Sequence, residues 1–135
     1  MFRASLVRAM LVAAVVAAVL VPVASAGMQP VIEVKSNVGK VIATEKKLGI
    51  YYWDTEKAAK GKIRCTGQCA VEWPPVYVTG KIPKHLKGVM ATLGTIKRGG
   101  KQQLTVNGLP AYTYEGDTAG VVKCDGVDGW RAVKV

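Results

Sequence analysis

Histidine, phenylalanine and acidic residues are scarce in this chain of 135 residues. It has one His, one Phe, and 9 Asp and Glu against 19 Lys and Arg. The single His has no Ser or Cys nucleophile near it, so hydrolytic chemistry is not expected, and the absence of a C-x-x-C-H motif disfavours covalent haem. Hydrophobic residues make up 50% of the chain, which excludes a disordered protein, and the length favours one small domain.

The beginning of the chain has the features of a secretory signal. Arg3 and Arg8 precede the apolar run 9–21, Pro22 interrupts that run, and small residues lead up to Ala26. This pattern predicts an N-terminal signal helix that is cleaved after Ala26. The apolar run is shorter than the about 20 residues that a membrane-spanning helix needs, so we expect no stable membrane span after cleavage.

We therefore predict a signal peptide over 1–26 and a single β-rich domain over 27–135, located in the periplasm or outside the cell. The mature chain stays strongly basic without Arg3 and Arg8, which favours an anionic envelope component or an acidic protein as its partner. Nucleic acid is not expected as a partner because export separates the chain from it.

Turn residues are frequent, and helical periodicity is rare. Gly99-Gly100 and Asn107-Gly108 supply the positive φ angles of tight hairpin turns. They separate three extended runs, which predict a meander over 92–98, 101–106 and 109–115. Further strands are expected at 31–34, 40–44, 49–54, 76–78 and 130–135, with a basic loop at 55–64 and one helical turn at 83–87.

The sequence contains an internal duplication. A glycine, an aromatic strand, a Cys-x-Gly element and a tryptophan follow one another twice. Cys65 and Trp73 of the first copy correspond to Cys124 and Trp130 of the second. Two copies are too few for a solenoid, so we expect them to pack against each other. The predicted fold is all-β: a small sandwich or flattened barrel of two pseudo-repeated antiparallel halves.

Short motifs in both copies resemble a family of bacterial secreted repeats, known as predicted lipoproteins of unknown function. Residues 112–117 read Tyr-Thr-Tyr-Glu-Gly-Asp and fit the family pattern Yx(FWY)xxD, while 51–56 is a variant that ends in Glu56. The segment 65–75 resembles the family element C-x-G-x-C-A-x-x-W-P-P. The resemblance extends over 39–120 and implies an exported β-rich domain without a defined activity.

Two features depart from that family. No lipobox cysteine is present near Ala26, so the resemblance does not extend to a lipid anchor. Cys124 also lies where the family is not expected to have a cysteine.

The three cysteines allow several arrangements in an oxidising compartment. A local disulfide between Cys65 and Cys69 is the leading prediction, and pairing of either residue with Cys124 is the rival. Cys65, Cys69, Cys124 and His85 also form a candidate zinc set, and Met28 and Met90 could add soft ligands for copper. A C-x-x-x-C spacing without a strand-to-helix context does not favour redox catalysis.

The remaining candidate binding residues belong to the aromatic motifs. They are Tyr51, Trp53, Trp73, Tyr112, Tyr114 and Asp117. Alternating aromatics on a half-buried strand usually form core contacts, and exposed ones would stack on a sugar or a quinone-like ring. The preferred function is a non-enzymatic envelope binding or interaction module with a structural disulfide. The alternative is a small metal-binding or electron-transfer protein that uses the Cys and His set.

Overall fold

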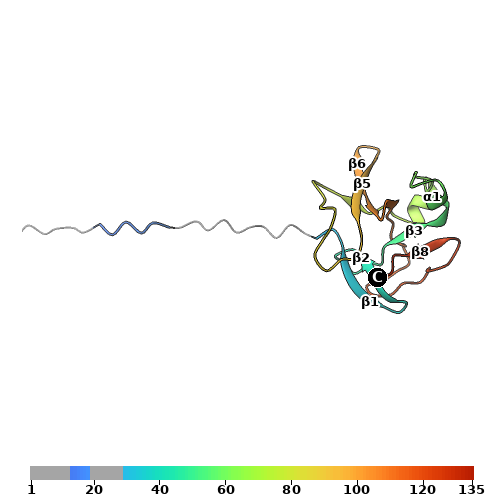
Figure 1. The fold of residues 1–135 in the computed structure, drawn as a ribbon, viewed down its shortest axis with the longest axis horizontal. Helices are drawn as coiled ribbons and strands as arrows, with labels where there is room; N and C mark the ends of the chain where they lie inside the picture. The colour runs from blue at the N-terminus through green and yellow to red at the C-terminus, as the bar shows by residue number, and fades with distance from the viewer. Residues whose placement is uncertain (1–12, 19–28) are drawn as a thin grey trace, which may run out of the picture.

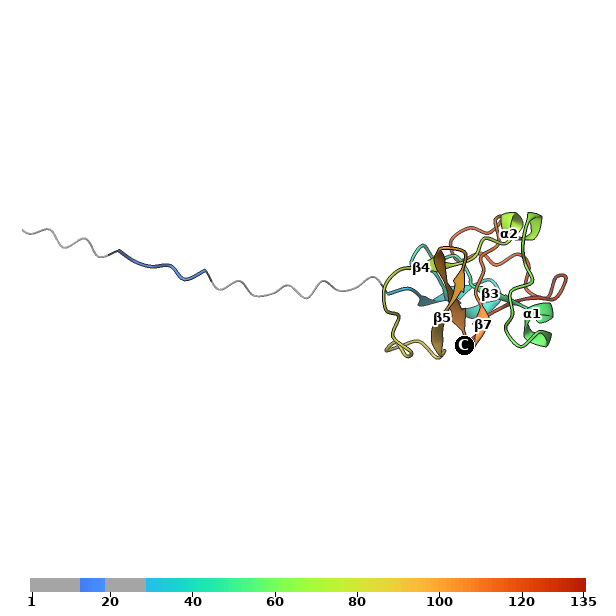
Figure 2. The same cartoon turned by 90° about the horizontal axis from the view of Figure 1, so that it is seen from above.

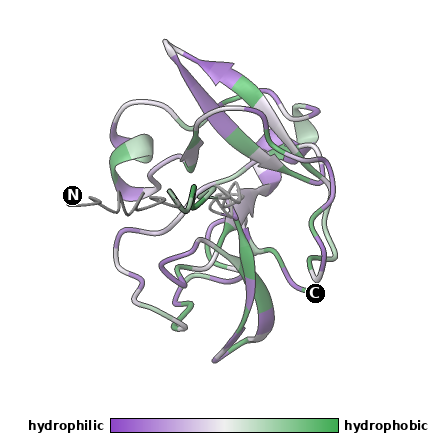
Figure 3. Ribbon diagram, turned by 90° about the vertical axis from the view of Figure 1, so that its left-hand side faces the viewer, coloured by the Kyte–Doolittle hydropathy of each residue, from purple (hydrophilic) through white to green (hydrophobic). Residues whose placement is uncertain are grey.

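The computed structural model describes residues 13–18 and 29–135, and its folded part consists mainly of antiparallel strands (Figure 1). The strands are β1 (Ile32–Ser36), β2 (Gly39–Ala43), β3 (Tyr51–Trp53), β4 (Tyr77–Val78), β5 (Leu93–Arg98), β6 (Lys101–Val106), β7 (Leu109–Pro110) and β8 (Trp130–Ala132). The β1–β2 and β5–β6 hairpins lie at opposite ends of the domain, and β3 and β8 lie between them (Figures 1 and 3). The predicted all-β fold of two antiparallel halves is confirmed, and the sheets of this part of the chain do not close into a barrel.

The hairpins form where the sequence has turn residues. Asn107 and Gly108 have φ angles of 53° and 79°, which a tight two-residue turn between β6 and β7 requires. Gly99, with φ 59°, begins the turn that pairs Arg98 with Lys101. Strands β5 and β6 follow the predicted bounds closely, because local turn chemistry fixes their register.

The two halves are joined through the backbones of their aromatic strands. Tyr51 and Tyr112 exchange two hydrogen bonds, with N···O distances of 2.8 and 3.0 Å. The contacts beside this pair repeat in both copies: Ile50 N–H donates to the Ile42 carbonyl, and Ala111 N–H donates to the Leu104 carbonyl. The predicted duplication is therefore also present in the tertiary structure, where the pair lies at the centre of an approximate two-fold arrangement.

Each aromatic strand pairs with the segment that follows the cysteine of the other copy. Strand β3 pairs with β8, while Tyr112 forms an antiparallel bridge with Pro75. The residues that follow the two aromatic strands also form equivalent contacts. Asp54 N–H donates to the Gly129 carbonyl, and Glu115 N–H donates to the Glu72 carbonyl. Neither copy can satisfy the backbone of its own aromatic strand without the other.

The core is divided into an aliphatic and an aromatic cluster. The aromatic cluster centres on Trp73 and Trp130, whose rings stack with centroids 3.9 Å apart and an interplanar angle of 7°. Tyr114 packs on the outer face of Trp73 at 4.9 Å, and Trp53 stacks on Trp130 at 5.1 Å. The aliphatic cluster is built around Ile42, Ile50, Leu93, Leu104 and Val106.

Two short helices occur that were not predicted. Helix α1 (Asp54–Ala58) follows β3 directly, and α2 (Gln68–Glu72) lies between Cys65 and Trp73. Each is only one turn long, so neither has the periodic apolar face by which a helix is recognised in a sequence. The basic segment 55–64 thus begins as a helix rather than as a loop.

Three further local predictions are wrong. Residues 83–87 form no helical turn; this segment of the inter-repeat connection is irregular. The strand predicted over 109–115 is shorter, because the chain leaves β6 after Pro110 and Tyr112 pairs with Tyr51 instead. Residues 13–18 are not helical, and the rest of the predicted signal helix lies outside the described residues. None of the helices within the described ranges has the length and hydropathy needed to cross a membrane.

We predict that Trp73→Ala lowers the free energy of unfolding by about 3–5 kcal/mol, because it empties the centre of the aromatic stack. Trp130→Ala should cost a similar amount, and the double variant should cost less than the two single losses together, because the rings share one contact. Urea unfolding measures each value. The control Val71→Ala, at a side chain that is 58% exposed, should change stability by less than about 0.5 kcal/mol; additive Trp losses would contradict the stacked pair.

Candidate functional site

The tyrosines and acids of the two sequence motifs bind across the copies. The Tyr51 hydroxyl donates to Asp117 Oδ2 at 2.6 Å, and the Tyr112 hydroxyl donates to Glu56 Oε2 at 2.7 Å. Tyr51, Tyr112 and Glu56 are fully buried. Each motif therefore places its tyrosine at the acid of the other motif.

The same two acids hold the loops that contain Cys65 and Cys124. Glu56 Oε2 accepts the backbone N–H groups of Arg64 at 2.7 Å and Cys65 at 3.1 Å. In the other copy, Asp117 Oδ1 accepts the Lys123 N–H at 3.0 Å. A buried carboxylate is tolerated where it accepts several hydrogen bonds, so these loops and the tyrosines stabilise one another.

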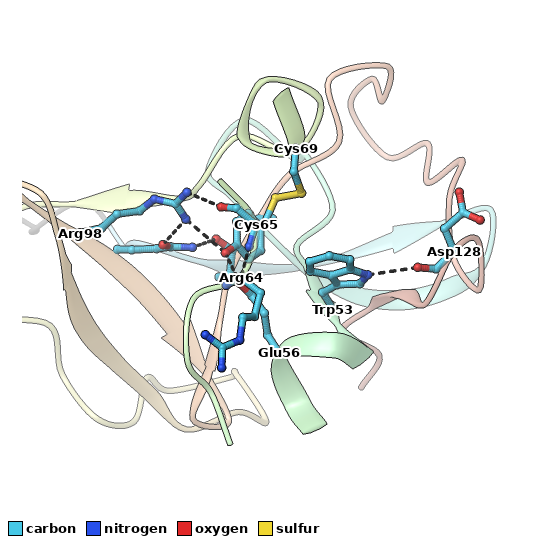
Figure 4. The surroundings of a disulfide bond; sticks show 10 residues. Trp53, Glu56, Arg64, Cys65, Cys69, Arg98 and Asp128 are labelled. Atoms are coloured by element: carbon cyan, nitrogen blue, oxygen red, sulfur yellow. Dashed lines mark hydrogen bonds between the residues drawn. A yellow bond between two sulfur atoms is a disulfide. The ribbon is translucent and has the colours of Figure 1, made fainter. Parts of the chain in front are cut away.

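A polar residue near the end of each hairpin also binds the cysteine loop of the other copy. Asn37, between β1 and β2, exchanges two hydrogen bonds with the Val122 backbone at 2.7 and 2.8 Å. Arg98, at the end of β5, donates to the Cys65 carbonyl (Figure 4) and to the Tyr112 hydroxyl oxygen. Side-chain hydrogen bonds and backbone pairing thus both act between the copies.

Burial changes the acid–base behaviour of the central tyrosines. Loss of solvent raises the pKa of Tyr51 and Tyr112 far above the usual value of about 10, and the hydrogen bonds to Asp117 and Glu56 raise these pKa values further. Both side chains therefore stay neutral donors at physiological pH. Neutral tyrosines beside carboxylates are typical of a structural network.

The structure contains the leading predicted disulfide. Cys65 and Cys69 are joined, with Cα atoms 5.2 Å apart, and the bond links the fully buried Cys65 to helix α2 (Figure 4). The rival pairing with Cys124 is not formed. Cys124 is a partly buried free thiol whose pKa is raised by burial, and it lies beside Tyr114.

The four residues of the predicted zinc set are not assembled. The disulfide occupies the sulfur atoms of Cys65 and Cys69, and His85 lies exposed in the segment between the repeats. Within 13–18 and 29–135, no group of three or more His, Cys, Asp or Glu residues is placed to hold a metal ion. Met90 is 80% exposed, and Met28 lies outside the described residues.

The predicted aromatic residues form the core instead of an exposed stacking platform. Tyr51 and Tyr112 have no exposed surface, and Trp73 is 6% exposed. Trp53 and Tyr114 are partly buried at the two ends of the aromatic stack. Asp117 is also buried, so the motif residues named as candidate binding residues are used to join the repeats.

Two surface grooves occupy equivalent places in the two copies. The first, of about 370 Å³, lies beside β4 and is lined by Val76, Tyr77 and Thr113 among others. The second, of about 420 Å³, is lined by the corresponding residues Val133, Lys134 and Tyr52. Sequence patterns did not predict either groove, because each combines segments that only the packing of the copies brings together.

The fold and these contacts define a class of protein: a β domain made of two repeats that complete each other. Residues 33–77, the first repeat from β1 to β4, match the family described as a secreted repeat of unknown function. The match confirms, over this segment, the resemblance that the motifs indicated. No curated protein and no solved structure showed significant similarity.

We predict that Tyr112→Phe lowers the free energy of unfolding at pH 7 by about 1–3 kcal/mol, because Glu56 loses a buried donor. The pH dependence should change too. A tyrosine whose pKa is raised by folding stabilises the native state below its unfolded pKa of about 10 and loses this contribution as the pH rises above it. Urea unfolding between pH 7 and 11 should show a smaller alkaline loss in Tyr112→Phe than in the parent.

Tyr77→Phe is the matched control, because Tyr77 is 44% exposed and no hydrogen bond involves its hydroxyl in the described part of the chain. It should leave both the stability at pH 7 and the alkaline slope unchanged. Equal effects of the two substitutions would show that the Tyr112 hydroxyl has no special role.

We predict that Cys69→Ser lowers stability by about 2 kcal/mol under oxidising conditions, since a disulfide that closes a short loop restricts the unfolded chain only modestly. In reductant the parent and the variant should melt at nearly the same temperature. Calorimetry with and without reductant measures the difference. An equal loss in both conditions would assign the effect to packing of the Cys69 side chain.

Proposed function

We propose that this protein is an exported, non-enzymatic binding module that acts in the periplasm or at the cell surface on an anionic envelope component. The family match supports export of the repeat, since its members are described as secreted. The motif acids and tyrosines are buried in contacts between the repeats, so they are not available as acid–base catalysts. Binding would therefore use residues on the surface of the domain.

The observation that carries the proposal is the positive charge on that surface. Three ion pairs are formed within the described ranges, and they neutralise Lys40, Arg131 and Lys134. The basic side chains that follow α1, among them Lys62 and Arg64, are exposed and take part in none of these pairs. Unneutralised charge of one sign attracts partners of the opposite sign.

Sedimentation of the mature chain with isolated cell envelopes tests the proposal. We expect binding that weakens steeply as the salt concentration rises from about 0.05 to 0.5 M, because exposed charges are screened over that range. The double variant Lys62→Glu and Arg64→Glu should bind less than the parent at low salt.

The matched control is Lys62→Arg and Arg64→Lys, which keeps the charge and should keep the binding. Binding that is absent in the parent, or that persists unchanged in high salt and in the charge-reversed variant, would overturn the proposal.

A further inference from the structure

Strand β4 is an edge strand with one open side. The order of the strands in its sheet is β4-β6-β5, so β4 pairs with β6, and none of the strands in 29–135 lies on its other side. It lies close to the start of the folded domain, where the chain, drawn in cyan, enters it (Figure 2). The groove of about 370 Å³ runs along this strand.

The open side presents backbone groups that can pair. Successive residues of an antiparallel strand direct their N–H and C=O groups alternately toward and away from the partner strand. The Val76 carbonyl accepts the Leu104 N–H at 2.8 Å, so Tyr77, the next residue, directs both of its backbone groups away from β6. An extended chain placed in the groove could form backbone hydrogen bonds with the Tyr77 N–H and C=O groups.

The groove also offers apolar surface around the backbone of Tyr77. Its apolar lining residues are Pro30, Leu48, Pro75, Val76, Val78 and Ile82. Val76, Val78 and Ile82 pack against the aliphatic core, so this wall is firmly held. Pairing along a strand edge together with pockets for alternate side chains is how many proteins bind extended peptides.

The second copy shows that folding does not require an apolar groove at this place. Lys134 occupies the position of Tyr77 there, and it forms an ion pair with Asp125 at 2.6 Å. Tyr77 is instead 44% exposed. The two copies share the backbone path but differ in chemistry, and the first copy keeps an exposed aromatic where the second has a neutralised charge.

Positive charge lies at the same groove. Lys46 is one of its lining residues, and the Lys101 ammonium lies 4.8 Å from the centre of the Tyr77 ring. Glu45 is the single acid among the described lining residues. The surroundings favour a segment whose apolar residues alternate with, or are flanked by, carboxylates.

We infer that the groove beside β4 binds an extended segment of an acidic protein, which adds to the sheet as a further strand. Its backbone pairs with Tyr77, its apolar side chains enter the groove, and its carboxylates meet Lys46 and Lys101. This inference rests on the proposed binding function and specifies the class of its partner.

The test uses a short synthetic peptide in which valine and threonine alternate between glutamate ends. Binding to the mature protein is followed by fluorescence anisotropy and by the amide resonance of Tyr77. Methylation of the central peptide nitrogen removes a backbone donor without changing charge, and it should weaken binding about tenfold or more. A peptide with lysine ends should bind more weakly than the glutamate peptide.

Two substitutions on the protein separate the backbone from the ring. Tyr77→Pro removes the outward N–H and should weaken binding about tenfold, whereas Tyr77→Ala keeps that N–H and should weaken binding less. An edge strand tolerates proline where its N–H faces solvent, and the melting temperature of each variant checks that it is folded. The methylated peptide tests the same backbone pairing without any change to the protein.

The inference is overturned if the methylated peptide binds as well as its parent, or if binding leaves the Tyr77 amide unshifted. Failure of the peptide while the protein still sediments with envelopes would point to an anionic polymer or lipid as the partner and would leave the proposed function standing. Loss of both would remove the proposed function as well.

Discussion

The structure depends on the reciprocal pairing of Tyr51 with Tyr112. Their backbones exchange two hydrogen bonds, and each hydroxyl donates to the acid of the opposite motif. Both side chains are fully buried, so an unpaired hydroxyl or carboxylate there would cost the full desolvation of a polar group. The pair therefore requires both repeats to be present and fixes how they meet.

The other contacts between the repeats follow from this pairing. Once Tyr51 and Tyr112 are opposite each other, Glu56 and Asp117 lie beside the cysteine loops, and Trp73 can stack on Trp130. A domain of this size has a small core, and these contacts concentrate aromatic area and hydrogen bonds at one place. The disulfide between Cys65 and Cys69 reinforces one copy only, so the second copy folds without a disulfide of its own.

The differences between the copies separate what the fold needs from what it leaves free. Tyrosine, acid and tryptophan occur in both copies because the contacts are reciprocal. Exposed positions do not have this constraint. Tyr77 and Lys134 occupy equivalent places, but one is aromatic and the other is charged. A motif shared by both copies is thus evidence about folding, while an exposed difference between them is evidence about binding.

Much of the local structure could be predicted from the residues. The Gly99-Gly100 and Asn107-Gly108 turns placed three of the strands, because Gly99, Asn107 and Gly108 adopt positive φ angles that most residues avoid. The repeated order of glycine, aromatics, cysteine and tryptophan revealed the duplication. The one-turn helices α1 and α2 were not predictable, since each is too short for a periodic apolar face and makes its contacts, Glu56 to Tyr112 and Cys69 to Cys65, with residues outside the helix.

The sequence by itself determined most of the strands, the two related halves and the leading choice of disulfide, because turn chemistry, residue order and short spacing are local properties. Only the tertiary structure decided that each tyrosine binds the acid of the other copy, that the motif aromatics are buried, and that His85 lies apart from the cysteines. It also decided that a groove opens beside β4. These outcomes depend on which segments meet in space, and residues far apart in the chain carry no local signal of that meeting.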